Sequence, residues 1–186
     1  MIGTRGRGDL VRPDRHRRIY ARTWRVDVVT RAGVQSPLAT AAIARAASNA
    51  LDAAGAPRPG SVTIVLTDDE ELAELNAEHM AVDGPTDVLS FPMLPPESFP
   101  DDGRPSGGGP AGLVRTHIGD IAISVERAIE QAADGRGGQT GDRRWAPADE
   151  LRLLVTHGTL HLSGMDHAEP GEEAAMRALE RDLLGR

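Results

Sequence analysis

Three histidines near the C-terminal end are the residues whose types and spacing could do chemistry. The segment HGTLHLSGMDH, residues 157–167, places His157, His161 and His167 at spacings of four and six. At positions i and i+4 of a helix two side chains share one face, and Gly164 can reverse the chain so that a third imidazole arrives. Three neutral imidazoles suit Zn²⁺ and leave its fourth position to water, as in catalytic sites. The motif predicts one zinc ion per chain.

The acid or base that would work beside this metal is less evident. In metzincin proteases with the same histidine spacing, a glutamate directly follows the first histidine and acts as general base. This chain has Gly158 there, so a metalloprotease is a disfavoured alternative. Asp166, next to the third histidine, either accepts the N–H of a ligand imidazole or acts as the base, and the first role is favoured. His16, His79 and His117 stand alone and are interpreted as structural or surface residues.

Composition limits the classes of protein. The chain has 186 residues, of which 39% are hydrophobic and 26% charged, as in one ordinary domain. It has no cysteine, so disulfides and thiolate metal sites are excluded. No apolar run approaches the roughly 20 residues that cross a bilayer, and no secretory signal is evident. These features favour a cytoplasmic protein without a membrane partner.

Charge is unevenly distributed. Residues 1–31 contain nine arginines and three acids, a net charge of +6, whereas the rest contain 12 arginines and 25 acids, a net charge of −13. A basic arm could grip nucleic acid through phosphates. The favoured interpretation is a disordered, Arg/Gly-rich extension over residues 1–22, followed by a single domain over residues 23–186.

The elements that position the histidines alternate between strands and helices. Period-two patterns predict strands near 24–28, 61–66, 86–91 and 117–125, and helical patterns predict helices near 37–55, 68–79, 126–133, 147–163 and 171–184. Ser36 is the expected N-cap of the first helix, and Thr67 with Glu70 the expected capping box of the second. Gly- and Pro-rich segments near 92–116 and 135–143 read as flexible loops. The expected fold is α+β, with a small mixed four-stranded sheet, about five helices and a zinc cleft at the C-terminal helical motif.

Two further segments accompany the histidine motif. They are LNAEHMAVDGPTDVLSFP, residues 75–92, and HIGDIAIS, residues 117–124. The three segments resemble the signatures of the YbeY family, which are H-G-x-L-H-L-x-G-Y-D-H, an LN segment followed by PTDVLSFP, and a GDI strand. They occur in the family's order and cover the chain from about residue 61 to its end. The family comprises bacterial, zinc-dependent, single-strand-specific endoribonucleases of 16S rRNA 3′-end maturation and ribosome quality control.

The resemblance implies a fold, a site and partners. It implies a mixed four-stranded sheet with one antiparallel strand, zinc held by the three motif histidines, and Asp87 near the zinc cleft as a second candidate acid. The implied partners are single-stranded RNA, 16S rRNA and the small ribosomal subunit, and no DNA is expected. The chain departs from the family by carrying Met165 in place of Tyr and His79-Met80 where an aromatic residue and Arg are common. An alternative is a ribosome-assembly factor with little or no cleavage activity, in which zinc mainly maintains the site.

Overall fold

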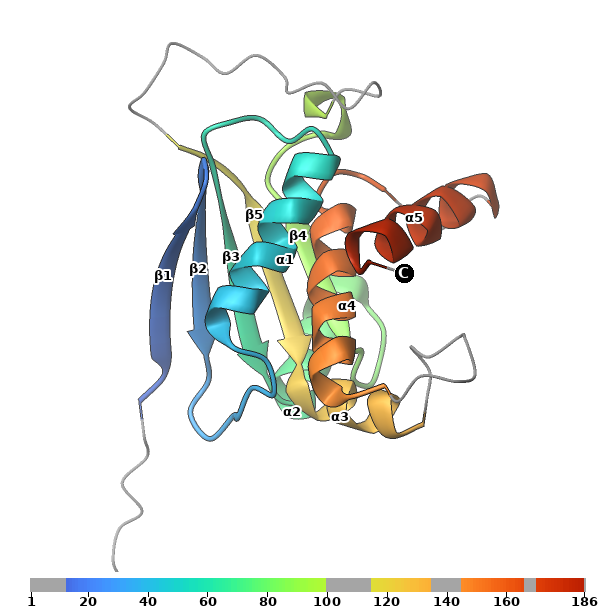
Figure 1. The fold of residues 1–186 in the computed structure, drawn as a ribbon. Coiled ribbons are helices and arrows are strands. Elements are labelled where there is room, and N and C mark those ends of the chain that lie inside the picture. Colours follow the sequence, from blue (N-terminus) through green and yellow to red (C-terminus); the bar gives the residue numbers. More distant parts are fainter. Residues whose placement is uncertain (1–12, 100–114, 135–144, 166–169, 186) are drawn as a thin grey trace, which may run out of the picture.

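The structure is a computed structural model that describes residues 13–99, 115–134, 145–165 and 170–185. Its strands are β1 (Arg15–Ala21), β2 (Trp24–Thr30), β3 (Gly60–Thr67), β4 (Val88–Pro92) and β5 (Thr116–Ser124). Its helices are α1 (Thr40–Ala53), α2 (Asp69–Met80), α3 (Val125–Ala133), α4 (Pro147–His161) and α5 (Pro170–Leu183), with a 3-10 turn η1 (Pro96–Ser98). Figure 1 shows these elements in one α+β domain.

The strands form one mixed sheet in the order β1-β2-β3-β5-β4. The pairs β2–β3 and β3–β5 are parallel, and the two edge pairs, β1–β2 and β4–β5, are antiparallel. Helix α1 connects β2 to β3, because parallel neighbouring strands need a crossover connection. Helix α2 connects β3 to β4, which lies on the far side of β5 in the sheet. The expected mixed sheet is therefore confirmed, with two antiparallel edge strands, β1 and β4, rather than the one that the family resemblance implies.

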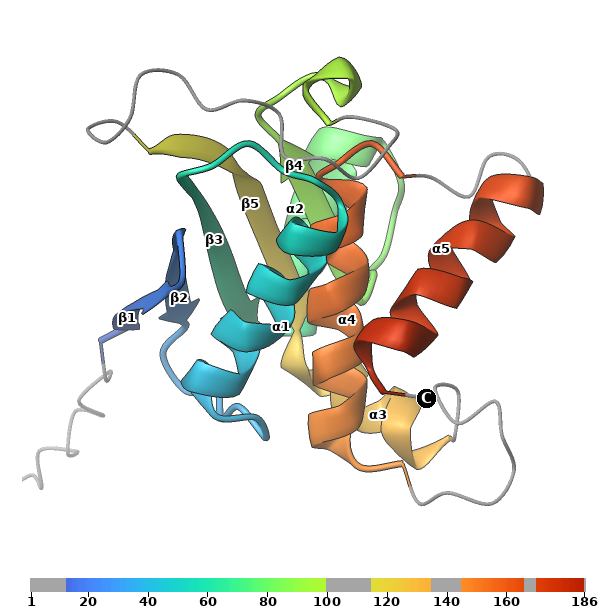
Figure 2. The ribbon, with the colours of Figure 1, turned by 45° about the horizontal axis from the view of Figure 1, so that its top comes forward.

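Helices cover the two faces of the sheet unequally. Helix α1 packs on β1 and β2, α4 packs on β4 and β5, and α5 packs on α4. Figures 1 and 2 show α1 and α4 side by side on one side of the sheet, with α5 next to α4. The core between this layer and the sheet holds fully buried apolar side chains from both, among them Trp24, Ile43, Ile64, Ile121 and Leu151. On the opposite face α2 packs on β4 and β5 over a small cluster centred on Leu72, Leu89 and Ala122.

The sheet has five strands rather than the expected four. The additional strand β1 lies within residues 1–22, where the Arg- and Gly-rich composition predicts a disordered extension, and residues 1–12 lie outside the described part of the chain. Sequence periodicity does not reveal β1, because five of its seven side chains are exposed and only Ile19 and Ala21 are partly buried. Its order comes from antiparallel pairing with β2 along its whole length.

Two predicted helix starts are displaced. Helix α1 begins at Thr40 with Ala39 as N-cap, and the Ser36 hydroxyl accepts a bond from the Leu38 N–H in the preceding turn instead (3.2 Å). Helix α2 is capped by Asp68, whose carboxylate accepts from the Glu71 N–H (3.0 Å). Helix α1 thus begins without a side-chain cap, whereas before α2 two adjacent residues, Thr67 and Asp68, are able to cap and local sequence does not choose between them.

The two expected flexible loops fall largely outside the described residues. Of the first, residues 100–114 lie outside, and the preceding residues form η1 and bury Phe99 against the core. The second, residues 135–143, lies outside entirely. In the described ranges, no helix has both the length and the apolar character needed to cross a membrane.

Candidate metal centre

Helix α4 presents the first two histidines of the motif. It begins with Pro147 at its first turn, where a missing N–H costs nothing, and the Asp149 carboxylate accepts from the Ala146 N–H (3.2 Å). Leu151 and Val155 on one face of α4 are fully buried in the core. This packing fixes the rotation of the helix and therefore the direction of His157 and His161, which are partly buried.

The two imidazoles converge. Their Nε2 atoms lie 3.1 Å apart, and the rings meet edge to face with centroids 4.6 Å apart. Two nitrogens bound at about 2.05 Å to one tetrahedral zinc ion would lie about 3.3 Å apart. The predicted i, i+4 pair therefore has a geometry that fits two ligands of a single ion.

Glu180 of α5 completes the surroundings of His157. Its Oε1 lies 2.7 Å from Nδ1 of His157, and its side chain is only 12% exposed. A carboxylate at Nδ1 holds a proton on that nitrogen and leaves the Nε2 lone pair free to bind a metal, the usual arrangement around a zinc-bound histidine. The chemistry of this donor set fits Zn²⁺.

Sequence reasoning did not select Glu180. Helix α5 carries four acids within the described residues, Glu172, Glu173, Glu180 and Asp182, and no spacing rule distinguishes one from the others. Only the packing of α5 on α4, visible in Figure 2, brings Glu180 to the histidine.

Gly158 lies against the sheet rather than toward the imidazole pair. A Cβ atom there would be 2.9 Å from methyl groups of Ile121 and Val88 and 3.2 Å from the Ser90 hydroxyl. The same hydroxyl donates to the Gly158 carbonyl (2.9 Å), joining β4 to α4. The glycine therefore serves close helix–sheet packing, and this position has no room for the glutamate that metzincin proteases carry.

The chain reverses after α4 as the motif predicts. Gly164 has φ +82°, in the left-handed region, and a Cβ there would meet Pro96 of η1 at 2.9 Å. Gly164 thus provides both the turn and a close approach to the loop that follows β4.

The remaining motif residues, Asp166 and His167, lie outside the described residues. Among the residues that are described, no group of three or more His, Cys, Asp or Glu is placed to hold a metal ion. The assignment of His157, His161 and His167 as metal ligands stays a prediction, and the positions of the first two fit it.

Asp87 lies immediately before β4 in a network of its own. One carboxylate oxygen accepts from the Val88 N–H (2.9 Å), and the other accepts from the Gln131 amide of α3 (2.8 Å). The Asp87 carbonyl also accepts from the Ser124 N–H (2.9 Å). These bonds tie β4 to β5 and α3, and its suggested catalytic role stays a proposal.

The isolated histidines have structural or surface surroundings in the described part of the chain. His117 contacts Asp120 (2.9 Å) and Ser61 (3.3 Å), His79 packs edge-on against Phe91, and His16 is exposed on β1. Met80, at the position where the resemblance implies Arg, is 46% exposed at the end of α2.

Comparison with known proteins places this chain among the nucleases. The family model of Endoribonuclease YbeY matches residues 29–186. An Endoribonuclease YbeY of Salinispora tropica is 43% identical over 78% of this chain and 85% of the relative. Those of Symbiobacterium thermophilum and Thermobifida fusca are 40% and 39% identical, over 76% and 86% of this chain and 82% and 91% of the relatives. The chain belongs to the Endoribonuclease YbeY family, and it is a nuclease and hence a hydrolase.

Proposed function

We propose that the chain is a zinc-dependent, single-strand-specific endoribonuclease that acts in 16S rRNA 3′-end maturation and ribosome quality control. The observation that carries the zinc part is the convergence of the His157 and His161 Nε2 atoms to 3.1 Å, with Glu180 at the opposite nitrogen of His157. This arrangement suits a shared cation.

His157, His161 and His167 would hold one zinc ion per chain. Bound there, zinc would draw in a phosphate oxygen and lower the pKa of a water to about 7. Glu180 holds the proton at Nδ1 of His157 and so keeps its Nε2 directed at the site. Asp166 would accept the N–H of one of the other imidazoles, or take the proton of the attacking water. Asp87 is the second candidate for that proton.

The proposed partners are single-stranded RNA and, within the small ribosomal subunit, the 16S rRNA. A cytoplasmic location would provide access to both. Membrane and DNA partners are not part of the proposal.

The test compares wild-type protein with His161→Ala on single-stranded and double-stranded RNA, with and without chelator. We expect wild-type protein to carry about one zinc per chain and to cut single strands until chelator is added. His161→Ala should lose both zinc and cleavage, whereas His16→Ala, which changes an exposed histidine on β1, should keep both.

Two results would contradict the proposal. Full zinc content in His161→Ala would exclude this histidine as a ligand. Normal zinc content in wild-type protein without any cleavage would instead favour the assembly-factor alternative, in which zinc only maintains the site.

A further inference from the structure

Strand β1 and the turn after it precede the residues that the family model matches. That match begins at residue 29, near the end of β2, and β1 is the strand that the expected four-stranded sheet does not contain. None of the candidate site residues inferred above lies in β1 or in the turn after it.

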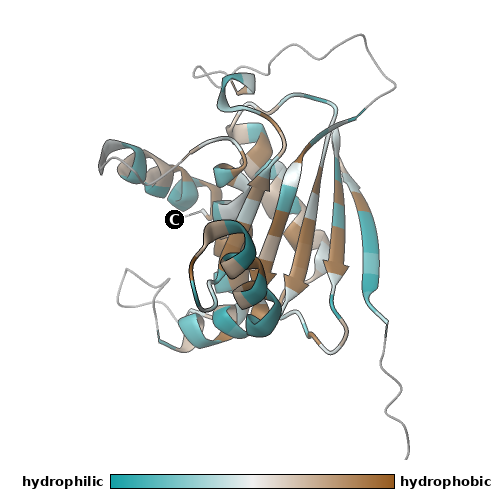
Figure 3. Cartoon of the chain, turned by 180° about the vertical axis from the view of Figure 1, so that it is seen from behind, coloured by the Kyte–Doolittle hydropathy of each residue, from teal (hydrophilic) through white to brown (hydrophobic). Residues whose placement is uncertain are grey.

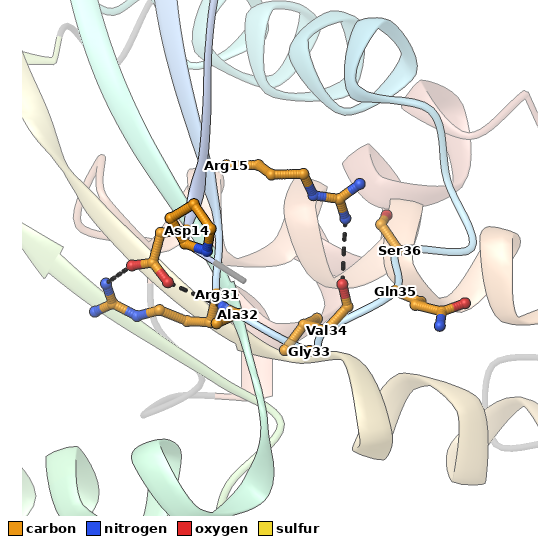
Figure 4. Close-up of a pocket in the computed structure, with 9 residues that line it drawn as sticks. Asp14, Arg15, Arg31, Ala32, Gly33, Val34, Gln35 and Ser36 are labelled. Atoms are coloured by element: carbon orange, nitrogen blue, oxygen red, sulfur yellow. Dashed lines mark hydrogen bonds and ion pairs between the residues drawn. The ribbon is translucent and has the colours of Figure 1, made fainter. Parts of the chain in front are cut away.

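The β1–β2 hairpin is firmly attached at its base. Figure 4 shows the Asp14 carboxylate between the Arg31 guanidinium (2.9 Å) and the Ala32 N–H (2.9 Å), and Arg15 donating to the Val34 carbonyl (3.2 Å). Partly buried Ile19 packs against the core. The hairpin can therefore hold exposed side chains in fixed positions.

The charge of this region is opposite to that of the whole chain, which is −7. The region comprises residues 13–31 and the charged residues whose side chains contact them. Eight arginines stand against four acids, a local net charge of +4; they are Arg15, Arg17, Arg18, Arg22, Arg25, Arg31, Arg58 and Arg115 against Asp14, Asp27, Asp52 and Glu71. Such a region attracts polyanions.

Part of this charge lies on the rear face of the hairpin, beside an aromatic ring. Cross-strand partners share a face, so Arg18 and Tyr20 lie on the same side as their partners Asp27 and Arg25. Tyr20, the only tyrosine of the chain, is 63% exposed. The Arg115 guanidinium lies 5.4 Å from its ring centroid. In Figure 3, which shows this face from behind, α2 lies over the part of the sheet near β4 and β5, and among the described residues no helix lies over β1 and β2 on this face.

We propose that Arg18, Tyr20 and Arg115 form a second surface for single-stranded RNA, separate from the histidine site. An exposed ring with guanidinium groups beside it stacks a base and contacts phosphates, whatever the base sequence. An acidic protein surface would form ion pairs with the two arginines but would not need the Tyr20 ring, which can stack on a base. RNA is therefore the favoured partner. The inference rests on the family's action on RNA, but not on zinc or on any particular cleavage site.

The surface is remote from the candidate metal centre. Strands β1 and β4 are opposite edges of the sheet, four strand spacings or roughly 19 Å apart. Helix α4, which carries His157 and His161, packs on β4 and β5 across the other face. A long RNA could reach both surfaces, whereas a short one could occupy only one.

The test measures binding of labelled single strands of about 6 and about 30 nucleotides over a salt series, and cleavage of the same RNAs. Tyr20→Val keeps a strand-forming residue without the ring, and Tyr20→Phe keeps the ring. Arg18→Gln/Arg115→Gln removes two charges. Arg45→Gln, an exposed arginine of α1 on the other face, is the control for loss of positive charge. Thermal unfolding verifies that every variant is folded.

We expect Tyr20→Val to weaken binding of the long RNA about 5- to 100-fold, and Tyr20→Phe to bind as wild type. The double variant should reduce the slope of log affinity against log salt by about 1.4, since each phosphate contact on a single strand contributes about 0.7. Cleavage of the short RNA should stay at the wild-type rate in all of them, which distinguishes this surface from the catalytic site. Unchanged affinity and salt slope in both folded variants would overturn the proposal and leave an acidic protein as the better partner. An equal loss in Arg45→Gln would also overturn it, because the effect would then be one of overall charge.

Discussion

Glu180 is the residue whose role the structure adds to the histidine motif. Its carboxylate lies 2.7 Å from Nδ1 of His157, so it sets which nitrogen carries the proton. We expect Glu180→Gln to weaken zinc binding about 10- to 100-fold, with cleavage restored by added zinc. Zinc titration and RNA cleavage at rising zinc measure this. Glu172→Gln, at the exposed start of the same helix, should behave as wild type.

Asp166 offers an informative comparison with Glu180. If Asp166 accepts a hydrogen bond from another ligand imidazole, Asp166→Asn should bind zinc as weakly as Glu180→Gln, and added zinc should restore its cleavage. If Asp166 is the general base, Asp166→Asn should bind zinc as wild type does and lose about 10²- to 10⁴-fold in cleavage rate, and added zinc should not restore it. Glu180→Gln with wild-type zinc affinity would show that the contact at Nδ1 does not tune His157.

At the scale of elements, the contact of α4 with the sheet depends on the missing side chain of Gly158. Gly158→Ala should gain up to about 1 kcal/mol of helix propensity. It should nevertheless destabilise the protein, since its Cβ would lie 2.9 Å from two methyl groups and overpacking costs about 1–3 kcal/mol. Chemical denaturation measures the difference. Gly171→Ala is the matched control, because a Cβ there meets nothing within 4 Å. A Gly158→Ala protein more stable than wild type would show that α4 can move away from β4 and β5 without cost.

Strand β1 is the element whose removal tests the five-stranded sheet. Deletion of residues 1–22 removes Ile19 from the edge of the core and the hydrogen-bonding partner of β2. We expect a loss of about 2 kcal/mol, or roughly 4–8 °C in Tm. Zinc content should not change, because α4 packs on β4 and β5 at the other edge of the sheet and α5 packs on α4. Deletion of residues 1–12 keeps β1, so comparison of the two deletions isolates its contribution. Equal Tm values would show that β1 adds nothing to stability.

For the whole molecule, one ion network joins segments that are distant in the sequence. Arg31 contacts Glu71 of α2 (2.5 Å) and Asp14 before β1 (2.9 Å). The hydrogen bonds from Arg31 hold the pKa of both carboxyl groups below their ordinary values, and raise the pKa of Arg31 itself. A depressed carboxyl pKa contributes stability above the unfolded-state value, here about 4.5 for Glu71, and that stability is lost as the pH falls through the folded-state pKa.

The network therefore predicts a pH-dependent difference in stability. Glu71→Gln should be less stable than wild type at pH 7, and the difference should shrink as the pH falls below about 4.5. Thermal unfolding of both proteins over a pH series measures it. Glu74→Gln, an exposed acid of the same helix, is the control. A difference that is constant with pH would show that Glu71 acts through packing rather than charge.

What could be predicted from the sequence follows from local patterns. His157 and His161 share a face because a helix repeats every 3.6 residues, and Gly164 turns the chain because it lacks a Cβ atom. The strands of the core were predictable because their buried faces impose apolar periodicity. The structure decided the rest through contacts between distant segments. Pairing with β2 orders β1, whose exposed side chains carry no such pattern, and packing of α5 on α4 selects Glu180 among several equivalent acids. The approach of α4 to β4 and β5 explains Gly158. These outcomes depend on which surfaces meet, and the residues concerned lie too far apart in the chain for any local pattern to relate them.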